Sequence, residues 1–281
     1  MTNWDFACSE PVDINIDRWT SGSIVVAGEP TDAIIVEVVP SRRSRNGDLL
    51  DEVEIEFEDH QLYVRGPREG AFRRNSGLDL TIKAPAGSSC AAKTVSADLS
   101  CVGAVSGLTL HTASGDLSAE TVTGDVSVRS ASGDVLLNTA NADVTVHTAS
   151  GDTTVTRIGG AARIHTASGD VALGYCAGPV TARTASGDVR LGAVVSGAIE
   201  VSSASGDAEV AVVPGIGVYL DLSSTTGSVR SELDEVNVDE GNEAMTAAVE
   251  IKVRTMSGDI RITRSRAERP GPVSEVPADV E

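Results

Sequence analysis

Aromatic residues are scarce in this sequence and make up 3% of its 281 residues. A thick globular core usually contains many large aromatic side chains, so their scarcity argues against a thick globular enzyme. Long amphipathic helical patterns are also missing, whereas the strand-forming residues valine, isoleucine and threonine are abundant. The composition therefore predicts an all-β protein with a narrow core of aliphatic side chains.

Cysteines are few and scattered, at Cys8, Cys90, Cys101 and Cys176. None of them forms a Cys-x-x-Cys pair, so neither a zinc site nor a disulfide framework is indicated. We expect reduced thiols, most of them buried.

Export and membrane signals are also lacking. The first residues carry no basic region, and no apolar run is long enough for a signal peptide or a membrane span. These features lead us to expect a cytoplasmic location.

Positive charge is in short supply, with 22 lysines and arginines against 41 aspartates and glutamates and a formal net charge of −19. A field of this sign repels phosphate backbones and anionic lipid surfaces. We therefore expect neither nucleic acid nor membrane as a partner. The simplest role of the charge is solubility, and the alternative is cation binding along acidic turns.

What the sequence does contain is a repeat. The stretch Thr112-Ala113-Ser114-Gly115-Asp116 returns almost unchanged every 18 residues. The Gly-Asp pairs of the series are Gly115-Asp116, Gly133-Asp134, Gly151-Asp152, Gly169-Asp170 and Gly187-Asp188, then Gly206-Asp207 after 19 residues and Gly258-Asp259 further on. A fixed period near 20 residues is typical of a solenoid, in which each coil packs on its neighbours.

Each repeat contains two short alternating segments separated by turns. In one coil these are Thr153–Thr156 and Ala162–Thr166, separated by the turn at Gly159-Gly160. Alternation directs Val155 and Ile164 inward. Two strands and two corners per coil predict a flattened parallel β-solenoid made of two facing sheets.

The chain divides into three predicted regions. Residues 1–87 do not follow the repeat and contain short alternating segments separated by turn residues, which predict an antiparallel β-head that caps the first coil. Residues 88–263 form the solenoid, with an acidic inserted loop at about 230–246. Residues 264–281 are rich in proline and charge, and we expect a disordered tail.

We interpret the corner residues as structural. Glycine allows the positive φ of a sharp turn, and the serine and aspartate side chains can bond backbone N–H groups. Stacked aspartates would lie about 4.8 Å apart and repel by about 0.9 kcal/mol per pair in water. Five residues before each aspartate is an outward position that is mostly cationic: His111, Arg129, His147, His165, Arg183, Ser202 and Arg254. We expect this column to offset the repulsion and to raise the pKa values of its histidines.

A second column is made of hydroxyl side chains that alternation directs inward: Thr112, Ser130, Thr148, Thr166, Thr184 and Thr255. We expect these hydroxyls to satisfy polar groups near the corner. His147 and His165 would be neighbours on the surface, where a shared metal ion is the alternative to a simple charge ladder.

Two other classes of function are alternatives for this sequence. Repeat-in-toxin β-rolls also have 18-residue coils and bind calcium, which makes Asp116, Asp134, Asp152, Asp170 and Asp188 calcium candidates, but their Gly-Gly-x-Gly-x-Asp spacing is absent. Carbohydrate-cleaving β-helices have longer coils, and a net negative surface would repel an anionic sugar chain. No nucleophile elbow, P-loop or His-x-x-x-His motif is present, so we expect no catalytic residues and no cofactor.

Three features together resemble a known family: Val12-Asp13-Ile14-Asn15-Ile16, the Ala-Ser-Gly-Asp-Val units, and the closing segment from Arg254 to Ile262. Over about residues 10–264 the chain is similar to the bacterial β-strand-repeat family called domain of unknown function 4097, or "putative adhesin", and most of all to actinobacterial members without a signal or anchor. The resemblance implies a β-solenoid with no established activity. We therefore expect a non-catalytic scaffold or interaction module whose partner is another protein, and a homo-oligomer remains open.

Overall fold

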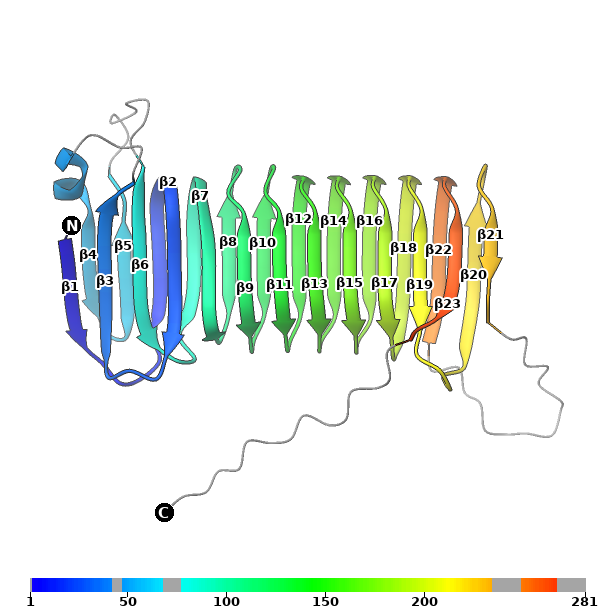
Figure 1. Ribbon diagram of the computed structural model, residues 1–281, viewed down its shortest axis with the longest axis horizontal. Helices are drawn as coiled ribbons and strands as arrows, with labels where there is room; N and C mark the ends of the chain where they lie inside the picture. Colours follow the sequence, from blue (N-terminus) through cyan, green and yellow to red (C-terminus); the bar gives the residue numbers. More distant parts are fainter. Residues whose placement is uncertain (1, 42–46, 68–76, 234–248, 267–281) are drawn as a thin grey trace, which may run out of the picture.

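The computed structural model describes residues 2–41, 47–67, 77–233 and 249–266, and it is a single elongated stack of strands (Figure 1). The 23 strands lie side by side along the long axis, and the one helical element in the described residues is the short 3₁₀ helix η1 (Gly47–Glu52). No helix in these ranges is long and apolar enough to cross a membrane. The predicted all-β solenoid is confirmed.

Two facing parallel sheets run along the stack, because each coil contributes one strand to each of them. Sheet A contains β8 (Leu108–Thr112), β10 (Val126–Ser130), β12 (Val144–Ser150), β14 (Ala162–Ser168), β16 (Val180–Ser186), β18 (Gly197–Ser205), β22 (Val249–Ser257) and β20 (Val218–Ser224). Sheet B contains β9 (Leu117–Val122), β11 (Val135–Ala140), β13 (Thr153–Ile158), β15 (Val171–Cys176), β17 (Val189–Val194), β19 (Ala208–Val212), β23 (Ile260–Arg264) and β21 (Val229–Ser231).

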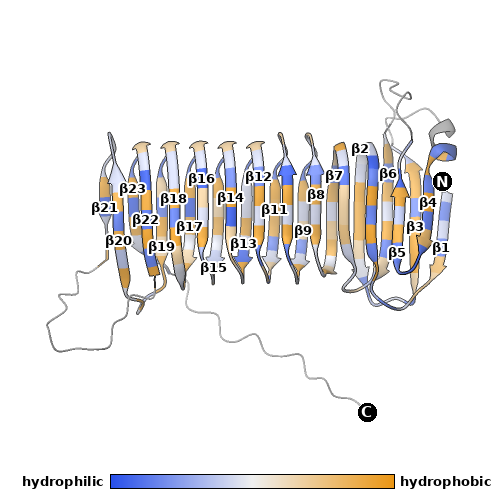
Figure 2. Ribbon diagram, turned by 180° about the vertical axis from the view of Figure 1, so that it is seen from behind, coloured by the Kyte–Doolittle hydropathy of each residue, from blue (hydrophilic) through white to orange (hydrophobic). Residues whose placement is uncertain are grey.

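The core lies between the two sheets and consists of the inward residues of every strand. In the coil that contains Thr153–Thr166, Val155 and Ile164 are both 0% exposed, as alternation predicts. The same alternation of apolar and polar residues is visible along most strands (Figure 2). Cys90, Cys101 and Cys176 are buried free thiols, which confirms the expectation for most of the cysteines. Burial raises the pKa of the Cys176 thiol to about 12.

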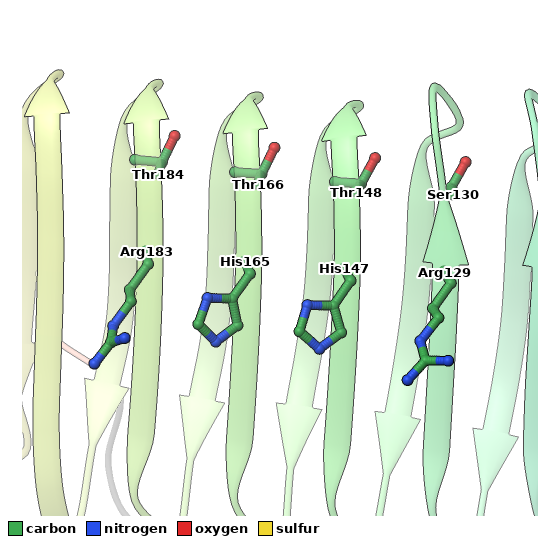
Figure 3. A pocket seen from close by; sticks show the side chains of 8 residues that line it. All are labelled: Arg129, Ser130, His147, Thr148, His165, Thr166, Arg183 and Thr184. Carbon is green, nitrogen blue, oxygen red and sulfur yellow. The ribbon is translucent and has the colours of Figure 1, made fainter.

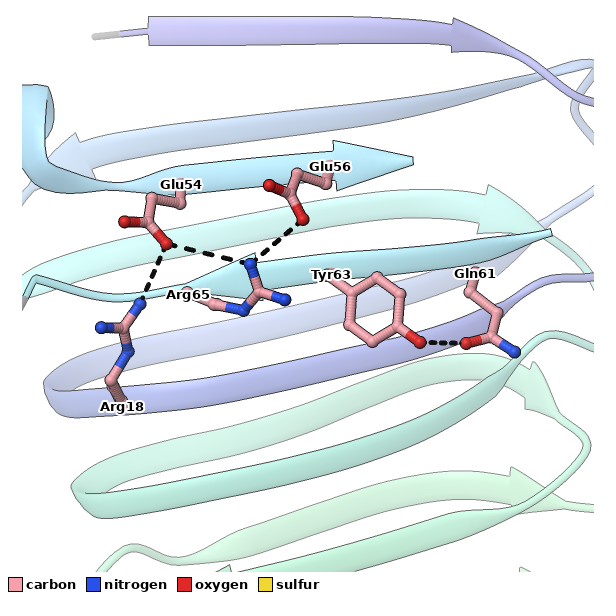
Figure 4. A network of polar contacts seen from close by, with 6 residues as sticks. All are labelled: Arg18, Glu54, Glu56, Gln61, Tyr63 and Arg65. Atoms are coloured by element: carbon pink, nitrogen blue, oxygen red, sulfur yellow. Dashed lines mark hydrogen bonds and ion pairs between the residues drawn. The ribbon is translucent and has the colours of Figure 1, made fainter. Parts of the chain in front are cut away.

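The N-terminal region is only partly the antiparallel head that was predicted. Antiparallel pairs join β1 (Thr2–Ala7) to β3 (Ala33–Pro40), β3 to β6 (Leu78–Pro85), and β4 (Glu54–Glu58) to β5 (Gln61–Arg65). An ion-pair network of Arg18 and Arg65 with Glu54 and Glu56 joins β4, β5 and β2, and the hydroxyl of Tyr63 donates to Gln61 beside it (Figure 4).

The boundary at residue 88 is wrong, because the solenoid already begins at β2 (Asp13–Glu29). This strand bends across both sheets and pairs in parallel with β7 (Ser89–Val105), which does the same. Inward residues of β2 stack directly on those of β7, with Ile14 on Cys90 and Val26 on Cys101. The repeat does not reveal this coil because its corner is Ser21-Gly22-Ser23 and has no aspartate.

The last two coils are stacked in an order that differs from their order in the sequence. β22 pairs with β18 on one side and with β20 on the other, and β23 lies in the same way between β19 and β21. The coil with Gly258-Asp259 is therefore stacked between the coil with Gly206-Asp207 and the coil with Thr226-Gly227-Ser228, which is the outermost one (Figure 1).

The remaining regional predictions fall mostly outside the described residues. Of the acidic segment at about 230–246, only residues 230–233 are described, and β21 ends within them at Ser231. Of the tail at 264–281, residues 264–266 are described: Arg264 belongs to β23, and Ser265 is buried. The predicted start of the tail at residue 264 is therefore wrong, and residues 267–281 of the predicted tail lie outside the described residues.

Candidate functional site

The corner between each sheet A strand and the next sheet B strand places the repeat motif on one edge of the solenoid. A Cβ atom built on Gly151 would lie 2.3 Å from the carbonyl oxygen of Gly133, and one on Gly169 would lie 2.2 Å from the carbonyl oxygen of Gly151. Both separations are far shorter than a carbon and an oxygen tolerate. The glycines are therefore required because successive corners approach closely.

The predicted positive φ is not the reason for these glycines. Positive φ occurs at neither of these two positions nor at Gly115, Gly133 or Gly258. At Gly187 and Gly206, φ is 158° and 157°, values that residues with a side chain rarely adopt. The predicted positive φ therefore occurs at two of the seven corner glycines, and at the other five the close contact alone requires glycine.

The aspartates of the motif form a continuous hydrogen-bonded column. In each case one carboxylate oxygen accepts the backbone N–H of the aspartate in the next coil. The bond from the Asp170 N–H to Asp152 Oδ1 is 2.8 Å long. The column runs from Asp98 through Asp116, Asp134, Asp152, Asp170, Asp188 and Asp207 to Asp259, whose carboxylate accepts the N–H of Ser228. These N–H groups stabilise the stacked carboxylates.

A shorter column of the same kind lies at the opposite corner. Asp125 accepts the N–H of Asp143, and Asp143 accepts the N–H of Ala161. The Ala161 N–H is the main reason that the pKa of Asp143 lies below its usual value, and Arg163 contributes as well. The Ser228 N–H lowers the pKa of Asp259 in the same way.

Replacing Asp143 by asparagine is expected to destabilise the protein at neutral pH and to have no effect in strong acid. A lowered folded pKa means that the charged carboxylate stabilises the fold above the unfolded pKa of 3.8 and that this stabilisation is lost as pH falls through the folded value. Urea denaturation of wild type and D143N at about pH 7 and about pH 2.5 measures the difference. An equal difference at both pH values would contradict it.

The cationic column predicted from the sequence exists, and it is one coil longer than predicted because it begins at Lys93. Its members are in register on the outer face of sheet A: Lys93, His111, Arg129, His147, His165, Arg183, Ser202 and Arg254. No ion pair among the described residues joins this column to the aspartate column. Arg183 contacts Glu200 at 3.0 Å, and Arg254 contacts Asp221 at 3.7 Å. The predicted compensation between the two columns is therefore wrong.

The predicted rise in the pKa values of the column's histidines is wrong for His165. Burial lowers the pKa of His165, and the nearby positive groups of His147 and Arg183 lower it further. The rings of His147 and His165 are stacked, with centroids 5.0 Å apart and planes 10° apart. The described residues contain no group of three or more potential metal ligands.

The inward hydroxyl column is satisfied only at its ends. Thr112 Oγ1 accepts the Gly115 N–H at 2.9 Å, and Ser224 Oγ accepts the Gly227 N–H at 2.9 Å. In the central coils the corner N–H groups instead donate to the carbonyl of the next coil, as Gly169 does to Ser186. Within the described part of the chain, the buried side-chain hydroxyls without a hydrogen-bond partner are those of Ser130, Thr148, Thr166 and Thr184 of this column, that of Ser203 in register with Thr184, and that of Thr153.

Thr166→Val is therefore expected to leave the free energy of unfolding unchanged or to raise it slightly. The valine keeps the shape of threonine and removes a buried hydroxyl that has no partner. Thr112→Val is the matched control, and it is expected to cost about 1 kcal/mol because it removes the acceptor of the Gly115 N–H. Denaturant unfolding of both variants tests the contrast, which is contradicted if Thr166→Val is the more damaging change.

A shallow groove follows the cationic column. One hollow of about 410 Å³ is lined by the side chains shown in Figure 3, which are Arg129, Ser130, His147, Thr148, His165, Thr166, Arg183 and Thr184. A second hollow of about 370 Å³ is lined by Lys93, Thr94, His111, Thr112, Arg129 and Ser130. The two hollows share Arg129 and Ser130, so they form one groove, named here the sheet A groove. The sequence identified its cations but not the hollow.

Comparisons with known proteins identify the family of this chain. No curated protein matches it. Similar solved structures include a "putative adhesin" from Bacteroides fragilis, at 14% identity and a TM-score of 0.45, covering 93% of this chain and 96% of the other. A "putative cell adhesion protein" from Clostridium sporogenes has 11% identity and a TM-score of 0.28, covering 94% and 99%. A "putative lipid binding protein" from Parabacteroides distasonis has 15% identity and a TM-score of 0.41, covering 93% and 96%. The family model described as Toastrack DUF4097 matches residues 12–263, and the chain therefore belongs to this family.

Proposed function

We propose that this protein is a non-catalytic interaction module and that the outer face of sheet A is its recognition surface. The observation that carries the proposal is the sheet A groove, because six coils present it in register on one flat face. Solenoids commonly supply extended surfaces of this kind. The stacked backbone makes the surface stiff, so that binding costs little conformational entropy.

The test is capture from a native lysate with three immobilised proteins. Wild type and a control with Arg157→Glu and Arg190→Glu, on sheet B, are expected to retain the same partner. A variant with Arg129→Glu and Arg183→Glu is expected to lose the partner. All four substituted arginines are exposed or partly exposed, but only Arg129 and Arg183 line the groove. Retention of the partner by all three proteins would place recognition elsewhere, and turnover of any polysaccharide by the wild type would contradict the non-catalytic role.

The calcium-binding alternative predicts a different outcome. In the corner column each aspartate already uses one carboxylate oxygen to accept a backbone N–H, which leaves fewer oxygens for a cation that requires six to eight. We expect saturating calcium to leave the melting temperature unchanged and to give no heat of binding in calorimetry. A clear binding heat together with a large rise in melting temperature would favour the β-roll instead.

A further inference from the structure

We propose that the sheet A groove binds a linear anionic polysaccharide, a chain of sugars that carry carboxylate or sulfate groups. The inference rests on the proposed function and names the class of ligand for the same surface. Four observations support it: the spacing of the cations, the lack of acidic side chains around them, the hydroxyl side chains beside them, and the closed backbone of the sheet.

The cations are evenly spaced along a straight line. Lys93, His111, Arg129, His147, His165 and Arg183 occupy one register position on six successive strands. Neighbours are about 4.8 Å apart, so the row is about 24 Å long. A pyranose unit is about as long as one step of this row. An extended chain of acidic sugars can therefore place its anionic groups against successive cations.

The groove is a cationic region on a strongly acidic protein. From β8 to β16, every outward position of sheet A is a hydroxyl residue, an alanine, a histidine or an arginine, and none is acidic. The repeat aspartates lie at the corners, where backbone N–H groups engage them. The net charge of −19 for the whole chain therefore does not describe the local charge of this face. Beyond β16 the first acidic residue at an outward position is Glu200, which pairs with Arg183, and at the opposite corner Asp143 pairs with Arg163.

The central cations have no acidic partner among the described residues. Arg129 makes no ion pair there, and His147 and His165 are stacked on each other (Figure 3). The field on His165 is positive, because His147 faces it from β12 and Arg183 faces it from β16, while Arg163 lies on its own strand. An anion in the groove would relieve this repulsion and favour the protonated form of His165.

The chemistry beside the cations fits sugars better than nucleic acid or peptide. In the neighbouring outward column, Thr109, Ser127, Thr145 and Thr181 carry hydroxyls that can exchange hydrogen bonds with those of a sugar chain, while Arg163 pairs with Asp143. No tryptophan, tyrosine or phenylalanine lies on this face between β8 and β16 to stack on a base. An acidic peptide that binds by strand addition needs a free sheet edge, and each of these strands is paired on both sides.

Binding to defined probes tests the inference. Fluorescently labelled oligogalacturonate supplies carboxylates, a heparin oligosaccharide supplies sulfates, and neutral dextran and single-stranded oligothymidylate are the controls. Wild type is expected to bind at least one acidic sugar, less tightly at higher salt, and to bind dextran not at all and DNA more weakly. R129Q/R183Q is expected to weaken the affinity by about tenfold or more, whereas R157Q/R190Q, which removes two charges from sheet B, leaves it unchanged.

A pH series adds a second readout. Affinity is expected to rise as pH falls from about 8 to about 5.5, because burial and the neighbouring His147 and Arg183 lower the pKa of His165, and a bound anion favours its protonated form. H165Q is expected to reduce this pH dependence, whereas the sheet B control R157Q/R190Q is expected to keep the pH dependence of wild type.

The outcomes separate this inference from the proposed function. Failure of both acidic sugars to bind, equal loss in R129Q/R183Q and R157Q/R190Q, or tighter binding of DNA would each overturn the ligand class. If sheet A variants still lost a captured partner in lysate, the interaction module would stand without the polysaccharide. If the lysate experiment also failed, both would be wrong.

Discussion

Replacing Gly151 by alanine is expected to lower the free energy of unfolding by about 3 kcal/mol or more. The new Cβ would lie 2.3 Å from the carbonyl oxygen of Gly133, and it would also meet the carbonyl carbon of the same residue at 2.8 Å. Both are backbone atoms that are held between stacked coils, so no flexible side chain can move aside. The corners would have to separate, which would strain the aspartate column on either side. Urea denaturation followed by circular dichroism measures the loss.

Gly107→Ala is the matched control, since the nearest atom to its added Cβ is 3.8 Å away and its φ is not positive. It is expected to change the stability little. If the two alanine variants were equally stable, the corner glycines would not be required by close contact, and the explanation given for the repeat motif would have to be abandoned.

Periodicity alone was sufficient to predict the architecture of the repeats. The 18-residue spacing places Val128, Val146 and Ile164 on one inner face, and the parallel pairing aligns them in one column. The cationic column could be predicted for the same reason, because residues at equal positions in equal coils must stack. Register is therefore the most predictable property of such a chain.

The order of the terminal coils could not be predicted in this way, because periodicity does not say which coil is outermost. The corner chemistry contains a signal that could have been used. Each aspartate accepts an N–H from the next coil outward, so the last coil needs no aspartate. Thr226-Gly227-Ser228 has serine at this position, and the Ser228 N–H donates to Asp259. A serine at the aspartate position is thus consistent with an end of the column.

The electrostatic interpretation failed because the sequence shows which charges recur but not which groups face them. Aspartate and cation columns five residues apart lie on different sides of a corner. The backbone N–H of Asp170, and not a histidine or arginine, is the partner of Asp152. Net charge was misleading for a similar reason, since it averages an acidic corner and a cationic sheet face. The candidate site therefore became visible only once both columns were placed in space.

Leu137→Ala is expected to cost about 2–5 kcal/mol of unfolding free energy, whereas Leu136→Ala costs almost nothing. Leu137 is 0% exposed and lies between the sheets, and Leu136 on the same strand is 52% exposed on the outer face of sheet B. The two changes remove the same atoms from adjacent positions, so the difference between them measures burial alone. Parallel pairing places Leu137 next to Val155 of the following coil and Ala119 of the preceding one, so a cavity there weakens three coils. Denaturant titration of both variants decides the matter. Similar losses would mean that the strand register is wrong, and with it the placement of the cations that line the sheet A groove.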